Sequence, residues 1–130
     1  MKKTYQEQQR LTGTAWVMTA SASIAEIKGQ LRKYVTSETT AKKVVGNLYI
    51  AAEKDNQIVY RQGNSLATAF TALLTLSDNN GSVTGRLTIE QWMENNGVST
   101  GTETMQTLIA RVKDAFEAAD PKTSIKELAK

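Results

Sequence analysis

The chain has 130 residues, of which 40% are apolar and 22% charged, with a net charge of +3 and neither histidine nor cysteine. These values are typical of one globular domain with one core, so we treat residues 1–130 as a single domain. Without imidazole and thiolate, the chain lacks the usual proton shuttle, the common ligands of zinc and haem, and the thiol nucleophile. We therefore expect a non-enzymatic protein without metal or cofactor.

The hydropathy of the chain indicates no association with a membrane. No apolar run approaches the roughly 18 residues of a membrane span, and the N-terminal residues lack the apolar segment of a signal peptide. We expect a cytoplasmic protein that does not bind membranes.

Positive charge is concentrated in the first half of the chain. Residues 1–62 hold ten Lys or Arg against five Asp or Glu, giving +5, whereas residues 63–130 hold six against eight, giving −2. We expect residues 1–12 to form a flexible basic arm. The basic half predicts contacts with nucleic-acid phosphates, while an acidic protein partner or a solvated surface would also fit. The candidate residues are Lys2, Lys3, Arg10, Lys28, Arg32, Lys33, Lys42 and Lys43.

The first predicted elements are a short strand at residues 14–19 and a helix at residues 24–35. Ser23 and Glu26 have the spacing of a capping box, and apolar residues then recur at intervals of three and four.

Residues 44–62 fit two structures. Ala41, Val44, Val45, Leu48 and Ala52 follow a helical stripe, whereas the runs on either side of residues 54–56 would suit a β-hairpin. The helix is slightly preferred.

The middle of the chain predicts two further helices separated by a polar loop. Ser65 can cap a helix whose apolar face is Leu66, Ala69, Phe70, Leu73 and Leu74. A loop rich in glycine and asparagine follows at residues 77–85. A short helix then begins at Thr88 and carries Ile89, Trp92 and Met93.

The C-terminal third carries the clearest helical pattern. Thr100 and Glu103 suggest a second capping box, and the apolar stripe continues to about residue 118 through Met105, Leu108, Ile109, Val112 and Phe116. Asp120 and Pro121 then suit the start of a last short helix containing Ile125 and Leu128. The sequence thus predicts a mainly α, single small helical domain, with an α+β alternative in which residues 47–61 form one β-hairpin.

Residues 88–118 contain a segment that resembles a helix-turn-helix DNA-binding domain. Trp92, Met93 and Val98 would be its packing residues, and Gly97 would take the turn. The resemblance implies that the second helix reads DNA with Thr102, Thr104, Gln106 and Arg111. Met93, Asn96 and Glu103 depart from the usual pattern of the family.

The composition also fits a second class of function, a self-assembling structural subunit such as a phage virion or coat component. A basic arm can reach a neighbour or packaged nucleic acid, and a broad apolar helix face can be buried against a symmetry mate. The expected partners are therefore DNA or RNA, copies of the chain itself, or both, with a homo-oligomer expected. Under the assembly alternative the protein would reside in a virus particle.

Overall fold

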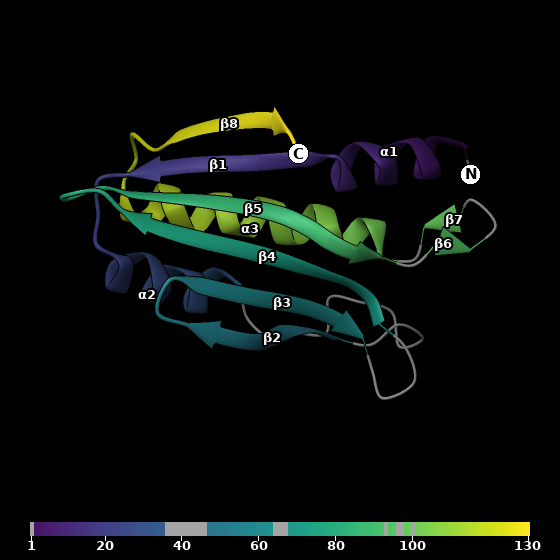
Figure 1. The fold of residues 1–130 in the computed structure, drawn as a ribbon, viewed down its shortest axis with the longest axis horizontal. Coiled ribbons are helices and arrows are strands. Elements are labelled where there is room, and N and C mark those ends of the chain that lie inside the picture. Colours follow the sequence, from purple (N-terminus) through teal and green to yellow (C-terminus); the bar gives the residue numbers. More distant parts are fainter. Residues whose placement is uncertain (1, 36–46, 64–67, 93, 96–97, 100) are drawn as a thin grey trace.

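The computed structural model describes residues 2–35, 47–63, 68–92, 94–95, 98–99 and 101–130 (Figure 1). Of these residues, 48% lie in strands and 36% in helices. The main feature is a six-stranded antiparallel sheet with strand order β2-β3-β4-β5-β1-β8. The prediction of a mainly α domain is therefore wrong.

The structure has three helices and eight strands in the described ranges. In order, they are α1 (Lys2–Thr12), β1 (Thr14–Ala20), α2 (Ile24–Tyr34), β2 (Asn47–Lys54), β3 (Gln57–Gly63), β4 (Thr68–Asp78), β5 (Val83–Trp92), β6 (Glu94–Asn95), β7 (Val98–Ser99), α3 (Thr102–Ala119) and β8 (Ser124–Ala129).

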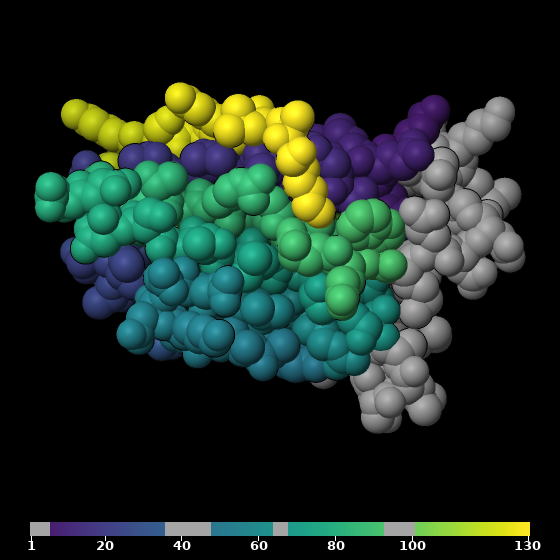
Figure 2. Space-filling model, viewed as in Figure 1, coloured from purple at the N-terminus to yellow at the C-terminus, as the bar shows by residue number. Residues whose placement is uncertain are grey.

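Helices α2 and α3 cover one face of the sheet, and the core lies between them and the strands (Figure 1). Alternate strand residues point into this core, among them Trp16, Phe70 and Leu87, while Phe116 enters it from α3. None of the described helices packs on the opposite face, which we call the open face. Figure 2 views the molecule from the side of the open face.

The helix predicted after Ser65 is wrong, because Thr68–Asp78 forms strand β4. Leu73 and Leu74, placed together on one helix face by the prediction, lie on opposite sides of the sheet: Leu74 is buried and Leu73 is half-exposed. The apolar residues at 70, 72, 74 and 76 follow a period of two. The alternating threonines at 71 and 75 suit a strand better than a helix.

The short helix predicted at Thr88 is also wrong, since residues 83–92 belong to β5. The predicted loop is confirmed only around residues 79–82, where Asn80 and Gly81 have positive φ angles of 52° and 97°. Gly85 lies inside β5. A Cβ atom there would come within 2.5 Å of Cζ of Phe116, so glycine lets α3 approach the strand.

The hairpin alternative for residues 47–61 is confirmed, and the preference for helix is wrong. Strands β2 and β3 pair around Asp55 and Asn56, with a register shift between Ile50 and Ala52. Residues 44–46 lie outside the described part of the chain.

Three predicted elements in the first and last parts of the chain are confirmed: β1, α2 and α3. Ser23 and Glu26 form the predicted capping box of α2. The N-cap of α3 is Gly101, with φ of 94° and no side-chain cap bond, while Thr100 lies outside the described residues.

The two ends of the chain differ from prediction. The last helix is wrong, because residues 124–129 form β8 and pair with β1. Residues 2–12, expected as a flexible arm, form helix α1, in which Gln8, Leu11 and Thr12 are buried. Among the helices in the described ranges, none is long and apolar enough to cross a membrane.

Candidate nucleic-acid interface

The basic residues predicted from the first half of the chain do not form one surface. Lys28 and Arg32 on α2 both pair with Glu53 on β2, at 3.5 and 3.0 Å. The ammonium of Lys28 also donates to the carbonyl of Lys54 at 2.7 Å. These two cations therefore link α2 to the edge of the sheet, and the single carboxylate of Glu53 balances one of their two positive charges.

The other predicted cations are dispersed. Arg10 pairs with Glu7 at 2.6 Å and with Glu127 at 3.5 Å. Lys33 is exposed on α2, 5.9 Å from the ring of Tyr34. Lys2 and Lys3 belong to α1, while Lys42 and Lys43 lie outside the described residues.

The residues expected to read DNA from α3 divide into buried and exposed groups. Thr102 and Thr104 are buried, so they do not present a DNA-reading surface. Gln106 is exposed but donates to Glu7 at 2.6 Å, and Arg111 is half-buried. Residues 88–92, expected to begin the first helix, belong to strand β5, and Trp92 is 38% exposed rather than packed. Met93, Gly97 and Asn96 lie outside the described residues.

The open face of the sheet carries a different and more ordered set of side chains. Residues opposite each other in an antiparallel pair share a face, so the register identifies rows of neighbours across all six strands. One row, which we call the cationic row, runs from β8 to β2 through Lys126, Val17, Arg86, Thr75, Gln57 and Lys54. At about 4.8 Å per strand it spans about 24 Å.

A second row, the apolar row, lies beside the cationic row, about 7 Å away along the strands. It contains Leu128, Ala15, Thr88, Leu73, Val59 and Ala52. Leu128 is 50% exposed, and Leu73 and Val59 are half-exposed. Ala15 and Thr88, between Leu128 and Leu73, are buried, so the row exposes apolar surface at Leu128 and again from Leu73 to Ala52 rather than as one continuous strip.

Arg61 and Tyr49 lie on the far side of the apolar row. The guanidinium of Arg61 donates to the hydroxyl of Thr68 at 2.8 Å through Nε and also to the hydroxyl of Tyr49. It lies 5.7 Å from the centre of the Tyr49 ring. These contacts hold the planar cation and the aromatic ring in place at one end of the open face.

Glu90 lies at the other end of the open face. Among the described strand residues that point to this face, it is the only carboxylate. It accepts a hydrogen bond from Thr88 and lies 3.7 Å from the ammonium of Lys130. That ammonium also lies 5.4 Å from the centre of the Trp92 ring. The open face thus carries five cations against one carboxylate, the cations being Lys54, Arg61, Arg86, Lys126 and Lys130.

None of these five cations was among the residues predicted from the sequence. Arg86 falls between the predicted loop at residues 77–85 and the helix predicted at Thr88, and Lys126 falls in the last predicted helix, so the sequence did not indicate that they share a face. The available signal was the alternation of polar and apolar residues from Thr84 to Glu90, which has the period of a strand.

The described residues contain no group of three or more Asp or Glu placed to hold a metal ion. No protein-family model and no curated protein matches the chain.

Proposed function

We propose that the protein binds single-stranded nucleic acid across the open face of its sheet, without catalysing a reaction. The observation that carries this proposal is the cationic row, in which Lys126, Arg86 and Lys54 recur across the sheet without an intervening carboxylate. A chain of phosphates laid across the strands would meet these cations in turn, and each contact would release counterions.

The neighbouring rows suit the other parts of a nucleotide. Bases would lie over the exposed residues of the apolar row, and Tyr49 offers a ring for stacking at one end of the face. Threonine hydroxyls at positions 71, 75 and 84 are half-exposed on the same face and can bond to sugar or phosphate oxygens.

The width of the face favours single strands over a duplex. The major groove of B-DNA is about 12 Å wide and admits a helix or a two-stranded ribbon, whereas six strands span about twice that width. Duplex DNA would touch the face only through its outer phosphates.

The test is the binding of fluorescein-labelled 15-nucleotide oligo(dT) and oligo(U), measured by anisotropy at several salt concentrations. The double variant Arg86→Gln, Lys126→Gln should bind about tenfold more weakly and lower the log-log salt slope by about 1.4, since each phosphate contact on a single strand contributes about 0.7. The control Lys33→Gln, Lys122→Gln removes two exposed cations elsewhere and should leave both values near wild type. Equal weakening in the two double variants would refute the assignment to the open face.

A self-assembling subunit is the second candidate, favoured by the exposed Leu128 in the apolar row. In that case the apolar row would be buried between copies. Leu128→Ser should then reduce the oligomer size in light scattering without weakening oligonucleotide binding.

A further inference from the structure

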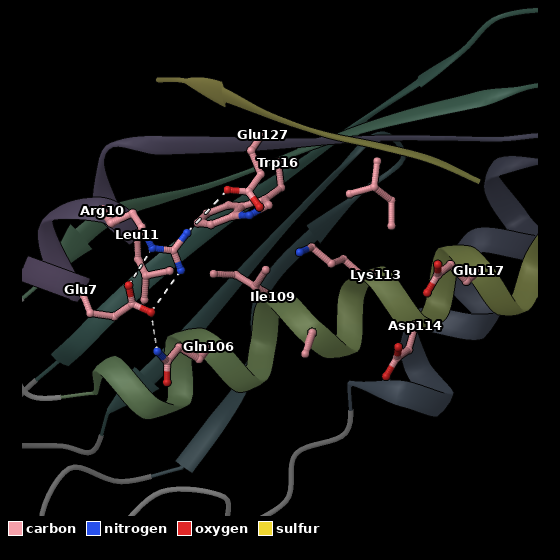
Figure 3. Close-up of a pocket in the computed structure, with 12 residues that line it drawn as sticks. Glu7, Arg10, Leu11, Trp16, Gln106, Ile109, Lys113, Asp114, Glu117 and Glu127 are labelled. Atoms are coloured by element: carbon pink, nitrogen blue, oxygen red, sulfur yellow. Dashed lines mark hydrogen bonds and ion pairs between the residues drawn. The ribbon is translucent and has the colours of Figure 1, made fainter. Parts of the chain in front are cut away.

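A groove with a volume of about 480 Å³ lies on the helix-covered side of the sheet, between α1, α3 and the inner side of β8 (Figure 3). Its floor is apolar and contains Leu11, Trp16, Ile109 and Ile125. Ile125 is half-exposed there. Leu11, Trp16 and Ile109 are buried, so the apolar surface that the groove leaves open is mainly that of Ile125.

The rim of the groove has an excess of negative charge. Four carboxylates line it against two cations, Arg10 and Lys113. Arg10 is already held by Glu7 and Glu127 (Figure 3). Hydrogen bonds from Arg10 and Gln106 also lower the pKa of Glu7, so this carboxyl stays charged near neutral pH. Asp114 and Glu117 make no ion pair with any described residue, so the charge favours a basic occupant.

One wall of the groove is an open sheet edge. Within the described part of the chain, β8 pairs with β1 alone, and its six residues are exposed or half-exposed. The backbone N–H and C=O groups on its other side can accept another strand. Ile125 and Glu127 point from this strand toward the groove, so an added strand would place alternate side chains there.

A second copy of the chain fits this edge poorly. In an antiparallel pair, opposite residues lie on the same face of the sheet, so two copies of β8 would pair symmetrically about one residue. The alignments that pair most of the strand are centred on Lys126 or on Glu127. Each register sets like charges directly opposite, which is destabilising.

We infer that β8 and the groove together bind a basic extended segment of another protein as a seventh strand. Its inward residues would alternate between apolar and basic, with an apolar side chain opposite Ile125 and a cation opposite Glu127. The segment would lie at the sheet edge and on the side of the groove, so it is compatible with a nucleic acid on the open face and does not depend on it.

The test uses the labelled peptide Thr-Lys-Thr-Ile-Thr-Lys-Thr, which directs Lys, Ile and Lys inward and neutral residues outward. It should bind the full chain in anisotropy measurements and change the emission of Trp16 in a Trp92→Phe background. The same peptide with Glu in place of Lys should bind at least about tenfold more weakly. Two N-methylated forms of the peptide test the strand pairing. Alternate backbone amides of a strand point toward its neighbour, so each form is methylated at one alternating set of amides, and the form methylated at the amides that face β8 should lose binding.

The protein variants locate the contact. Asp114→Asn with Glu117→Gln should weaken binding of the Lys peptide severalfold, whereas Asp55→Asn with Asp78→Asn, an equal charge change at exposed positions elsewhere, should leave it unchanged. The proposal is overturned if the Lys peptide fails to bind at about 100 µM, if the Glu peptide binds equally well, or if both N-methylated forms keep full affinity. The proposal is also overturned if sedimentation shows that the protein is a dimer and that the Lys peptide dissociates this dimer. A second copy of the chain would then occupy the edge.

Discussion

At two glycines, the same substitution to alanine is expected to have opposite effects on stability. At Gly85 a Cβ atom would lie 2.5 Å from Cζ of Phe116, a buried ring that has little room to move. Gly85→Ala should therefore lower the free energy of unfolding by about 1–3 kcal/mol, as overpacking does. Urea denaturation followed by circular dichroism measures this change.

Gly29 provides the matched control for the same substitution. It lies inside α2, and a Cβ atom there would meet nothing within 4 Å. Gly29→Ala should stabilise the protein by about 0.5–1 kcal/mol, because alanine loses less entropy in a helix. If Gly85→Ala were also neutral or stabilising, the close packing of α3 on β5 would be wrong.

Tyr60 has a buried hydroxyl with no hydrogen-bond partner among the described residues. Burial, with a smaller contribution from the charge of Glu53, raises the pKa of its phenol above the ordinary value of 10.0. The folded state holds the phenol proton of Tyr60 more tightly than the unfolded state does. The contribution of this protonated phenol to stability is therefore present below about pH 10 and is lost as the pH rises above that value.

Tyr60→Phe should therefore be neutral or stabilise the protein by up to about 1 kcal/mol at pH 7, since it removes an unsatisfied polar group. It should also reduce the loss of stability between about pH 9 and 11. Melting temperatures of both proteins at pH 7 and pH 10.5 test this prediction. A marked loss of stability at pH 7 would mean that the hydroxyl has a partner.

At the scale of elements, sequence reasoning succeeded where local signals agree with the final environment. The capping residues Ser23 and Glu26 and the apolar stripe of α3 act within a few residues, so α2 and α3 could be predicted. Strands β4, β5 and β8 depend on distant partners in the sheet. Their short apolar runs match both a helical and a strand period, and only the pairing decides between them.

The candidate site was missed for the same reason. A row across six strands joins residues as distant in sequence as Val17 and Lys126. The sequence reveals the number of cations, but it does not reveal that Lys28 and Arg32 are paired with Glu53 while Arg86 and Lys126 share the open face.

The loop between α3 and β8 is fixed by one carboxylate. Asp120 accepts hydrogen bonds from the backbone N–H of Ser21 at 2.8 Å and of Lys122 at 3.0 Å. These bonds lower the pKa of Asp120 below its ordinary value of 3.8. Their contribution to stability is therefore present above about pH 4 and is lost as the pH falls through the lowered value.

Asp120→Ala should lower the melting temperature at pH 6, and the difference from wild type should shrink on acidification below about pH 4. Asp78→Ala, which removes another exposed carboxylate, is the control and should have little effect at either pH. A difference for Asp120→Ala that does not change between pH 6 and pH 2.5 would contradict the role of the charged carboxylate.

At the scale of the whole molecule, the two sides of the sheet differ in charge. The open face carries five cations against one carboxylate, while the groove on the helix-covered side has four carboxylates against two cations. This separation is hidden in a net charge of only +3. It directs a polyanion to one side of the molecule and leaves the other side available to a basic partner.

The most direct test of the central claim is an NMR titration of isotope-labelled protein with short oligo(dT). We predict that the largest amide shifts fall on the strand residues of the cationic and apolar rows, from Lys126 through Arg86 to Lys54, with little change along α2 and α3. Shifts confined to the two helices, or no shifts at about 100 µM oligonucleotide in low salt, would contradict binding at the open face.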